Sequence, residues 1–551
     1  MSLRNRLFLP IIGFALAALA GCGSNTNNPV APPSGGFSNT NFNGTYTFSV
    51  FGSDMPSTSL SPFAIVGTLT ACGCSAGTIA GGTVSLANST GTTSSVPVSG
   101  SGSGYSVTTD GRGKATLSIA TNSGTVLVLL DFVLTSSSHG WIIRFDGNGT
   151  GSGSIDLQPT AVTQSSLTNS YAVSLSGTDL SNLDPLAMNG SFTLDASGNI
   201  GTSGNTAGVA DFNHFVNSTG APQAGLALSG SVHVGAGTAP GIASLATSFS
   251  VNPLTFDVYA VDSTHLKLIE KDGQAFLVGD AFAVSSTTMP SGSLVFTMAG
   301  PDPGNLPFSA GGIVTSDGTS TLTSGAEDVN DNGVVDNNTS PSAPYSFTGT
   351  FTASGNGRYL VTLTGFAGGT NFVAYPSDSG VLLLEMDSGL NSGITSGTAI
   401  VQTSGAALAA SQGYGMNFTG TDLSSGGSEV DEIAQFNTTS TGMTGLLDEN
   451  DFPVTSPGTS NLKGTYSPGS NGTGAAGFNT GLAGMFYYAA DSSTILFISA
   501  DSGEVGVGDM GNQTAPASAQ AQVTARHLAM IRPALRSQAA VRRQIRFTPS
   551  K

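Results

Sequence analysis

The residues that could carry redox chemistry gather in one short segment near the N-terminus. Cys72 and Cys74 flank Gly73. Residues i and i+2 of an extended strand lie about 6.6 Å apart at Cα, which is near the upper limit for a disulfide, but the intervening glycine lets the chain bend. In an oxidising compartment this spacing predicts a local disulfide. The bridge would close too small a loop to add much stability.

The same segment contains a possible nucleophile. Residues 73–77, GCSAG, match the Gly-x-Ser-x-Gly elbow of hydrolases, but that elbow needs a strand before it and a helix after it, and here a β-like run follows. With 76 glycines in the chain, about one such match is expected by chance. His139 and His265 occupy the same place in two repeats, which favours inherited structure over a catalytic triad. We find no catalytic constellation and predict that the chain is not an enzyme.

A further candidate is a run of oxygen-bearing side chains at residues 328–339. The segment DVNDNGVVDNNT resembles the calcium loop of EF-hand and dockerin-like repeats. The resemblance implies a sharp turn at Gly333 and a Ca²⁺ ion as the cofactor. The ligands that it implies are Asp328, Asn330, Asn332 and Asp336. Thr339 stands where the family has a bidentate acid, so a plain polar hairpin loop is the alternative.

These segments belong to a repeat that recurs four times. A strand followed by Gly-x-Asp appears at intervals of 125, 123 and 120 residues, and one register position in it holds Tyr46, Tyr171, Leu294 and Tyr414. A second landmark, Gly-x-x-Asp-x-Asn, occupies 208–213, 325–330 and 445–450, and has decayed to GTVSLA at 82–87. Several ordered landmarks at one period make chance similarity improbable.

The pattern within each repeat is typical of antiparallel β-structure. Short runs alternate apolar and small polar residues, and Asn-Gly and Asp-Gly pairs separate them. For the first repeat we predict eight strands, near 45–51, 63–71, 77–87, 95–109, 113–121, 125–136, 140–146 and 152–158. The predicted fold is all-β, with four tandem antiparallel meander modules, each a small up-and-down barrel or a two-sheet sandwich, and the barrel is favoured.

The modules are expected to fold as separable units. Their predicted bounds are 41–160, 164–288, 289–405 and 408–513. A single large transmembrane barrel is disfavoured, because the landmarks repeat per module instead of per hairpin and only 7% of residues are aromatic.

The N-terminus has the pattern of an export signal. A short basic stretch precedes an apolar run at 7–20, which is too short to span a bilayer comfortably. The run ends in LAGC, which resembles the lipobox of bacterial lipoproteins. The resemblance implies a signal peptide at 1–21, lipidation of Cys22, and, because Gly23 follows instead of Asp, transport to the outer membrane. The Asn-, Pro- and Gly-rich residues 22–40 are predicted to be a flexible tether.

Charge is scarce and unevenly distributed. Only 9% of the residues are charged and the net charge is −18, which excludes a basic nucleic-acid binder. All 34 acidic residues but only seven basic ones lie between 7 and 525, whereas the Ala-rich tail, 514–551, has seven basic residues and no acid. We predict that the tail is solvated. The alternative is a basic amphipathic segment that contacts anionic lipid or the acidic body.

Together these features predict a lipid-anchored, non-enzymatic cell-envelope protein that acts as a spacer, adhesin or binding array. Its partner, and whether it faces the periplasm or the cell surface, stay open. The alternative function is a small-ligand carrier with an apolar molecule in each barrel-like module, and a secreted hydrolase is a weaker one. A deep pocket in one module, lined by residues that its siblings lack, would favour a ligand site.

Overall fold

The computed structural model describes residues 30–514, apart from 34, 56–59, 90, 122–123, 168–169, 181–182, 202–207, 217–218, 336–344, 390–391 and 425. The predicted signal peptide at 1–21, Cys22 and the part of the basic tail after Thr514 lie outside the described residues. The described part consists of β-strands and two short 3₁₀-helices, η1 (Asn39–Asn41) and η2 (Gln164–Ser166), and contains no α-helix. None of its helices is long and apolar enough to cross a bilayer.

Barrel 1 is a closed antiparallel meander in which each strand pairs with the next and the last pairs with the first. All eight strands predicted for the first repeat are present, with ends that differ by at most four residues. They are β1 (Asn43–Asp54), β2 (Ser61–Cys72), β3 (Ile79–Asn88), β4 (Gly91–Val107), β5 (Arg112–Thr121), β6 (Gly124–Leu134), β7 (His139–Arg144) and β8 (Gly149–Leu157).

Barrel 4 has the same closed topology, completed by pairing of its first and last strands. Its strands are β28 (Gly413–Asp422), β29 (Ser428–Thr438), β30 (Gly442–Phe452), β31 (Gly458–Pro468), β32 (Thr473–Phe478), β33 (Gly484–Ala489), β34 (Ile495–Ser499) and β35 (Glu504–Asn512).

Barrel 2 closes through the pairing of its third and fourth long strands and carries two short extra strands, β11 (Asn199–Ile200) and β13 (Thr219–Gly220). Its eight long strands are β9 (Ser170–Asp179), β10 (Pro185–Thr193), β12 (Gly208–Val216), β14 (Gln223–His233), β15 (Gly241–Ala246), β16 (Leu254–Ala260), β17 (His265–Glu270) and β18 (Ala275–Ala283).

Barrel 3 closes through the pairing of its second and third strands and carries one short extra strand, β22 (Val334–Val335). Its eight long strands are β19 (Ser291–Pro301), β20 (Pro307–Asp317), β21 (Thr321–Asp331), β23 (Tyr345–Ala353), β24 (Tyr359–Thr364), β25 (Asn371–Ser377), β26 (Gly380–Glu385) and β27 (Ser396–Val401). The fold is therefore all-β, with four eight-stranded antiparallel barrels in tandem, and barrels are present where the sequence had left a sandwich open.

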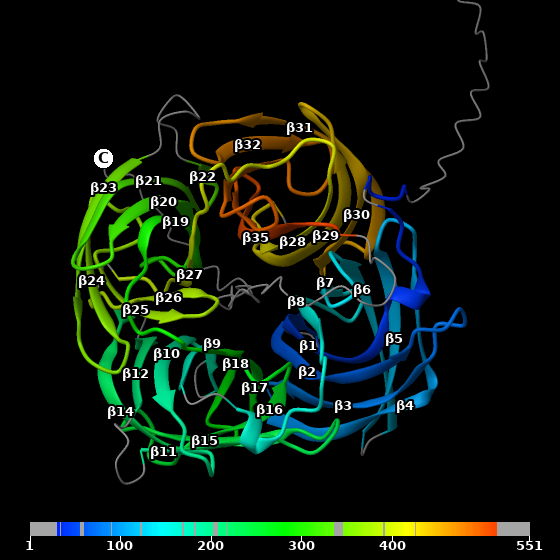
Figure 1. Cartoon of the computed structure of the whole chain (residues 1–551), viewed down its shortest axis with the longest axis horizontal. Helices are drawn as coiled ribbons and strands as arrows, with labels where there is room; N and C mark the ends of the chain where they lie inside the picture. Colours follow the sequence, from blue (N-terminus) through cyan, green and yellow to red (C-terminus); the bar gives the residue numbers. More distant parts are fainter. Residues whose placement is uncertain are drawn as a thin grey trace, which may run out of the picture.

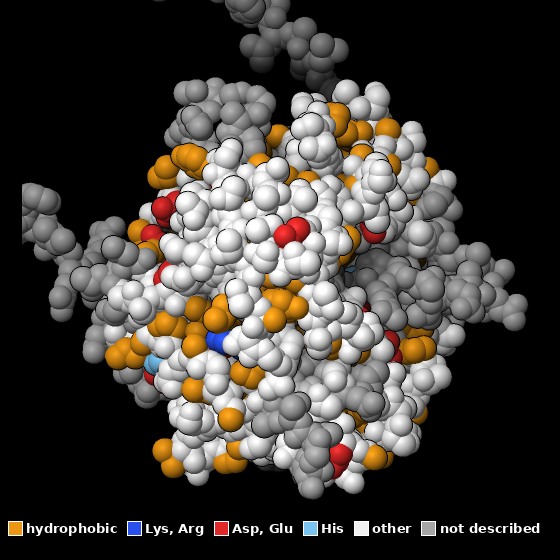
Figure 2. Space-filling model, turned by 60° about the vertical axis from the view of Figure 1, so that its left-hand side comes forward, with side chains coloured by type: hydrophobic (Ala, Val, Ile, Leu, Met, Phe, Trp, Pro, Cys, Tyr) orange, Lys and Arg blue, Asp and Glu red, His pale blue; other side chains and the backbone are white. Residues whose placement is uncertain are grey.

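The four barrels form a closed ring (Figure 1). Barrel 1 (blue) contacts barrel 2 (green), barrel 3 (yellow-green) follows, and barrel 4 (orange) returns to barrel 1. The contacting strand pairs include β2 with β17, β10 with β26, β20 with β35 and β29 with β8. On the face in Figure 2, most of the surface is backbone and uncharged polar side chains, with few charges.

Apolar residues form two sets of cores. Each barrel interior has its own cluster, such as the one that contains Tyr46 and Phe132 in barrel 1. A smaller cluster fills each joint between barrels, such as that of Val133, Trp141 and Ile433 between barrels 1 and 4. Strands at the joints are therefore buried on both faces: all ten residues of β28 are buried, whereas β24 on the outside alternates.

The chain is already packed within the segment that the sequence assigned to the tether, residues 22–40. Phe37 is only 3% exposed and belongs to the core of barrel 1. Its amide donates to the main-chain oxygen of Thr109 at 3.0 Å, and Pro32 is also buried. A tether ahead of the ring is therefore confined to the residues before Pro32.

Candidate functional site

The Gly-x-x-Asp-x-Asn repeat lies at the joints between barrels. Its last residue is a fully buried asparagine whose side-chain amide donates to main-chain oxygens of the next barrel. Asn450 of β30 donates to Arg144 at 2.8 Å and to Gly149 at 2.9 Å, both at the turn between β7 and β8. Equivalent bonds run from Asn213 to Glu385 (2.7 Å) and from Asn330 to Asp501 (2.8 Å) and Glu504 (2.9 Å).

The aspartate of the same motif makes a second contact across the joint. Asp328 accepts the hydroxyl of Tyr488 at 2.8 Å. Asp211 accepts the hydroxyl of Tyr375 and two guanidinium nitrogens of Arg358, Nε at 2.7 Å and Nη2 at 2.6 Å. Burial, and then the adjacent carboxylates, raise the pKa of Tyr375 and of Tyr488 well above the usual value, so both hydroxyls remain donors.

The two joints of barrel 1 depart from this pattern. Val133 occupies the register position of the joint tyrosines, and Asp448 instead accepts Arg112 Nη1 at 3.0 Å. On the other side of barrel 1, Ser85 replaces the aspartate of the motif and donates to Asp257 of β16 at 2.5 Å. The joint tyrosine is kept here, because the hydroxyl of Tyr259 lies 2.9 Å from that of Ser85. The acid therefore comes from the neighbouring barrel at this joint. The same landmark thus forms all four joints with four different chemistries.

A buried ion cluster reinforces the joint between barrels 1 and 2. The side chain of Lys267 on β17 is 0% exposed, and its ammonium lies 3.3 Å from Asp156 Oδ2 on β8 and 3.3 Å from Asp280 Oδ1 on β18. The two histidines that share a register position complete the cluster: His139 bonds Asp156 and His265 bonds Asp280, each at 2.7 Å.

Electrostatics keep this cluster charged. Burial disfavours the ammonium, but the carboxylates of Asp280 and Asp156 outweigh burial and raise the pKa of Lys267 above its ordinary value. Burial alone would raise the pKa of the two carboxyls, but Lys267 and the histidines outweigh burial and lower the pKa of both. Because all three charged groups are buried, the cluster can hold two barrels together but cannot reach a substrate.

Barrel 4 contains a second group of carboxyls, of which Glu432 is buried and Glu449 and Glu504 are half-buried. Glu432 on β29 pairs across the sheet with Glu449, and Glu504 begins β35. Burial and the neighbouring carboxyls raise the pKa of Glu432 well above its usual value and that of Glu504 to about 8. No group of three or more His, Cys, Asp or Glu among the described residues is arranged to hold a metal ion.

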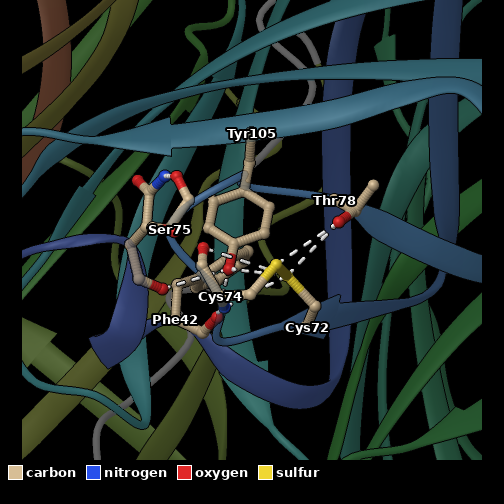
Figure 3. The surroundings of a disulfide bond; sticks show 7 residues. Phe42, Cys72, Cys74, Ser75, Thr78 and Tyr105 are labelled. Carbon is tan, nitrogen blue, oxygen red and sulfur yellow. Dashed lines mark hydrogen bonds between the residues drawn. A yellow bond between two sulfur atoms is a disulfide. The ribbon is translucent and has the colours of Figure 1, made fainter.

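Cys72 and Cys74 form a disulfide in the turn after β2 (Figure 3). Their Cα atoms are 5.1 Å apart, closer than in an extended strand, and Gly73 takes a φ of +60° that permits the bend. The hydroxyl of Tyr105 lies 3.7 Å from Cys72 Sγ. Ser75 is exposed in the same turn and leads into β3, so the strand–turn–helix geometry of a nucleophile elbow is not formed here.

Three of the four predicted calcium ligands lie in the described part of the chain. Asp328 and Asn330 engage barrel 4, as described above, and Asn332 lies in the turn before β22 with a φ of +49°. Asp336 lies outside the described residues. Calcium binding at this loop stays a prediction. Asn330 donates across the joint through its amide nitrogen, whereas its Oδ1, the atom that would bind an ion, accepts the main-chain amide of Gly333 at 3.0 Å.

Comparison with known proteins adds no family. Neither protein-family models nor curated proteins match the sequence. The fold and the joints define a structural class, which is a closed ring of four eight-stranded barrels. Its function has to be inferred from the residues of this chain.

Proposed function

We propose that this chain is a lipid-anchored, non-enzymatic protein of the bacterial cell envelope, and that its ring of barrels is a rigid platform for binding a partner. The observation that carries the proposal is the LAGC sequence ending at Cys22, close ahead of a packed ring. Pro32, the first buried residue of the described chain, lies ten positions after Cys22. Fully extended, this stretch reaches about 35 Å, which would hold the ring near the membrane.

The non-enzymatic part rests on where the reactive groups lie. The ion cluster around Lys267 and the arginine–aspartate pairs are buried between barrels. Their lone pairs and protons are used in contacts between modules, so they are not open to a substrate. The role of a binding platform is supported over that of an extended spacer, because the barrels fold back into a ring instead of a line (Figure 1).

The anchor can be tested by replacing Cys22 with serine in the full chain and following acyl labelling and membrane fractionation. The expected result is loss of label and release from the membrane fraction. The matched control is Cys72→Ser with Cys74→Ser, which removes the other two cysteines and should leave the label unchanged. Label that persists in Cys22→Ser would overturn the anchor, and protease treatment of intact cells would distinguish the surface from the periplasmic face.

A further inference from the structure

Three of the four barrels are closed at one end by a tyrosine at the same register position. This residue lies in the first strand of its barrel, is fully buried, and donates its hydroxyl to a main-chain oxygen in the turn before the seventh strand. The bonds are Tyr46 to Ser137 (2.6 Å), Tyr171 to Ser263 (2.6 Å) and Tyr414 to Ser492 (3.4 Å). Barrel 3 has Leu294 at this register position, so it lacks both the ring and the hydroxyl.

The interior of barrel 3 contains a cavity of about 60 Å³ that Leu294 lines. Met289, Met298, Phe347 and Phe372 line it as well, and every exposed atom of its wall is apolar. An apolar cavity offers water no hydrogen-bond partner and stays dry, while an apolar guest gains the dispersion contacts that the wall lacks. This is a space lined by a residue that differs from its equivalents in the sibling barrels.

We propose that the interior of barrel 3 is a binding site for a small, uncharged, apolar molecule, no larger than a short hydrocarbon. The site exists because leucine replaces the tyrosine that closes the other barrels. A charged or strongly polar ligand would be excluded, because the wall could not replace its hydration. The proposal is independent of lipid anchoring and goes beyond the role of a binding platform.

The opposite end of barrel 3 provides the entry. Phe366, in the loop between β24 and β25, is half-buried and lines the cavity. Its ring makes edge contacts with Phe347 at 5.1 Å and with Phe372 at 5.7 Å between centroids. Gly365 and Gly369 flank it with φ of +87° and +130°. A half-buried aromatic side chain on a glycine-rich loop therefore forms part of the cavity wall at this end of the barrel.

Methionine methyl groups allow a direct test in the full chain. The interiors of three barrels each contain buried methionines: Met188 in barrel 2, Met289 and Met298 in barrel 3, and Met416, Met443, Met485 and Met510 in barrel 4. We would label the methionine methyls with ¹³C and titrate the protein with dissolved xenon, an apolar atom that occupies such cavities. The expected result is a saturable shift confined to Met289 and Met298. No shift at these two methyls, or equal shifts at all of them, overturns the proposal.

Two variants test the cause of the cavity. Leu294→Tyr restores the residue of the sibling barrels, so it should fill the cavity and abolish the xenon response of Met298. Tyr171→Leu makes the converse change in barrel 2 and should create a response at Met188. The chemical-shift dispersion of Met289 and Met298 reports whether barrel 3 is folded in Leu294→Tyr, and that of Met188 reports the same for barrel 2 in Tyr171→Leu. A response at Met298 that survives Leu294→Tyr overturns the site, and if that variant does not fold, the absence of a new response in Tyr171→Leu does so.

Discussion

Replacing Lys267 by methionine should destabilise the joint between barrels 1 and 2. Methionine keeps much of the aliphatic volume but removes the ammonium that lies 3.3 Å from both Asp156 and Asp280. Two carboxylates with at most 10% of their side-chain surface exposed would then lose their counter-charge. Removing one partner of a buried ion pair costs roughly 3–5 kcal/mol, and we expect a loss of that size in the free energy of unfolding.

The loss should depend on pH in a direction that the two carboxyls fix. In the native chain the pKa of both Asp156 and Asp280 is lowered, so they contribute stability above the unfolded-state pKa, about 3.9, and lose it only as pH falls through the lower folded-state pKa. Without Lys267 only His139 and His265 still oppose the effect of burial, so the pKa values of both carboxyls rise above those in the native chain. The variant is therefore weakest at neutral pH, and its deficit narrows as acid protonates the two groups.

The measurement is urea unfolding followed by circular dichroism at pH 7.5 and pH 5. Because a ring of four barrels need not unfold in one step, the midpoint of the first transition is compared. Lys463→Met is the matched control, since Lys463 is exposed on β31, and it should change stability by no more than about 0.5 kcal/mol. Equal midpoints for the two variants, or a Lys267→Met deficit that widens on acidification, would refute the reasoning.

Two further predictions concern the joint between barrels 4 and 1. Asn450→Ala removes the donor to the main-chain oxygens of Arg144 and Gly149. It should lower the free energy of unfolding by roughly 1–3 kcal/mol. Faster hydrogen exchange at the β7–β8 turn is the expected result, and unchanged protection there would contradict the prediction. Gly511→Ala would place a Cβ 2.9 Å from Trp141 Cη2, so the emission of the single tryptophan should shift to the red. Gly147→Ala, with nothing within 4 Å, is the control, and equal spectra would argue against this packing.

The strands of each barrel could be predicted because each hairpin carries its own local pattern. In the first repeat the Asp110–Gly111 turn and the alternation of Tyr46, Phe48 and Val50 were enough to define strands and turns. Closure was left open between barrel and sandwich, because it depends on pairing of β1 with β8, about a hundred residues apart. No local pattern specifies that pairing.

The joints were missed because their strands look half-exposed in the sequence. In β28 the residues Tyr414, Met416 and Phe418 face the barrel interior, and the small polar residues between them look suited to water. Asn417 is nevertheless fully buried, and Ser152 of barrel 1 donates to its Oδ1 at 2.8 Å. A small polar residue is equally suited to contact with another barrel and to contact with solvent. Alternation alone therefore could not distinguish a strand at a joint from a strand on the outer surface.

The Gly-x-x-Asp-x-Asn repeat carried a signal for the joints, although its third copy was interpreted as the start of a calcium loop. The contacts of Asp328 and Asn330 lie 160 or more residues away in the sequence, which explains why spacing could not reveal them. The usable signal was the repetition itself. A polar pair kept at one register in several modules needs a partner that every module also supplies, and in a tandem array the neighbouring module is such a partner.

The altered motif of the first repeat makes the joints of barrel 1 different from the others in the ring. Head-to-tail joints of one kind can close a ring within a chain or link modules of different chains into a filament. Here barrel 1 offers Ser85 where the others offer aspartate, and Val133 where the others offer tyrosine, and its partners are Asp257 and Asp448 through Arg112. Its two joints are therefore chemically unlike those between barrels 2, 3 and 4. A barrel that fits only its own neighbours favours closure within one chain and gives barrel 1 a fixed place in the ring.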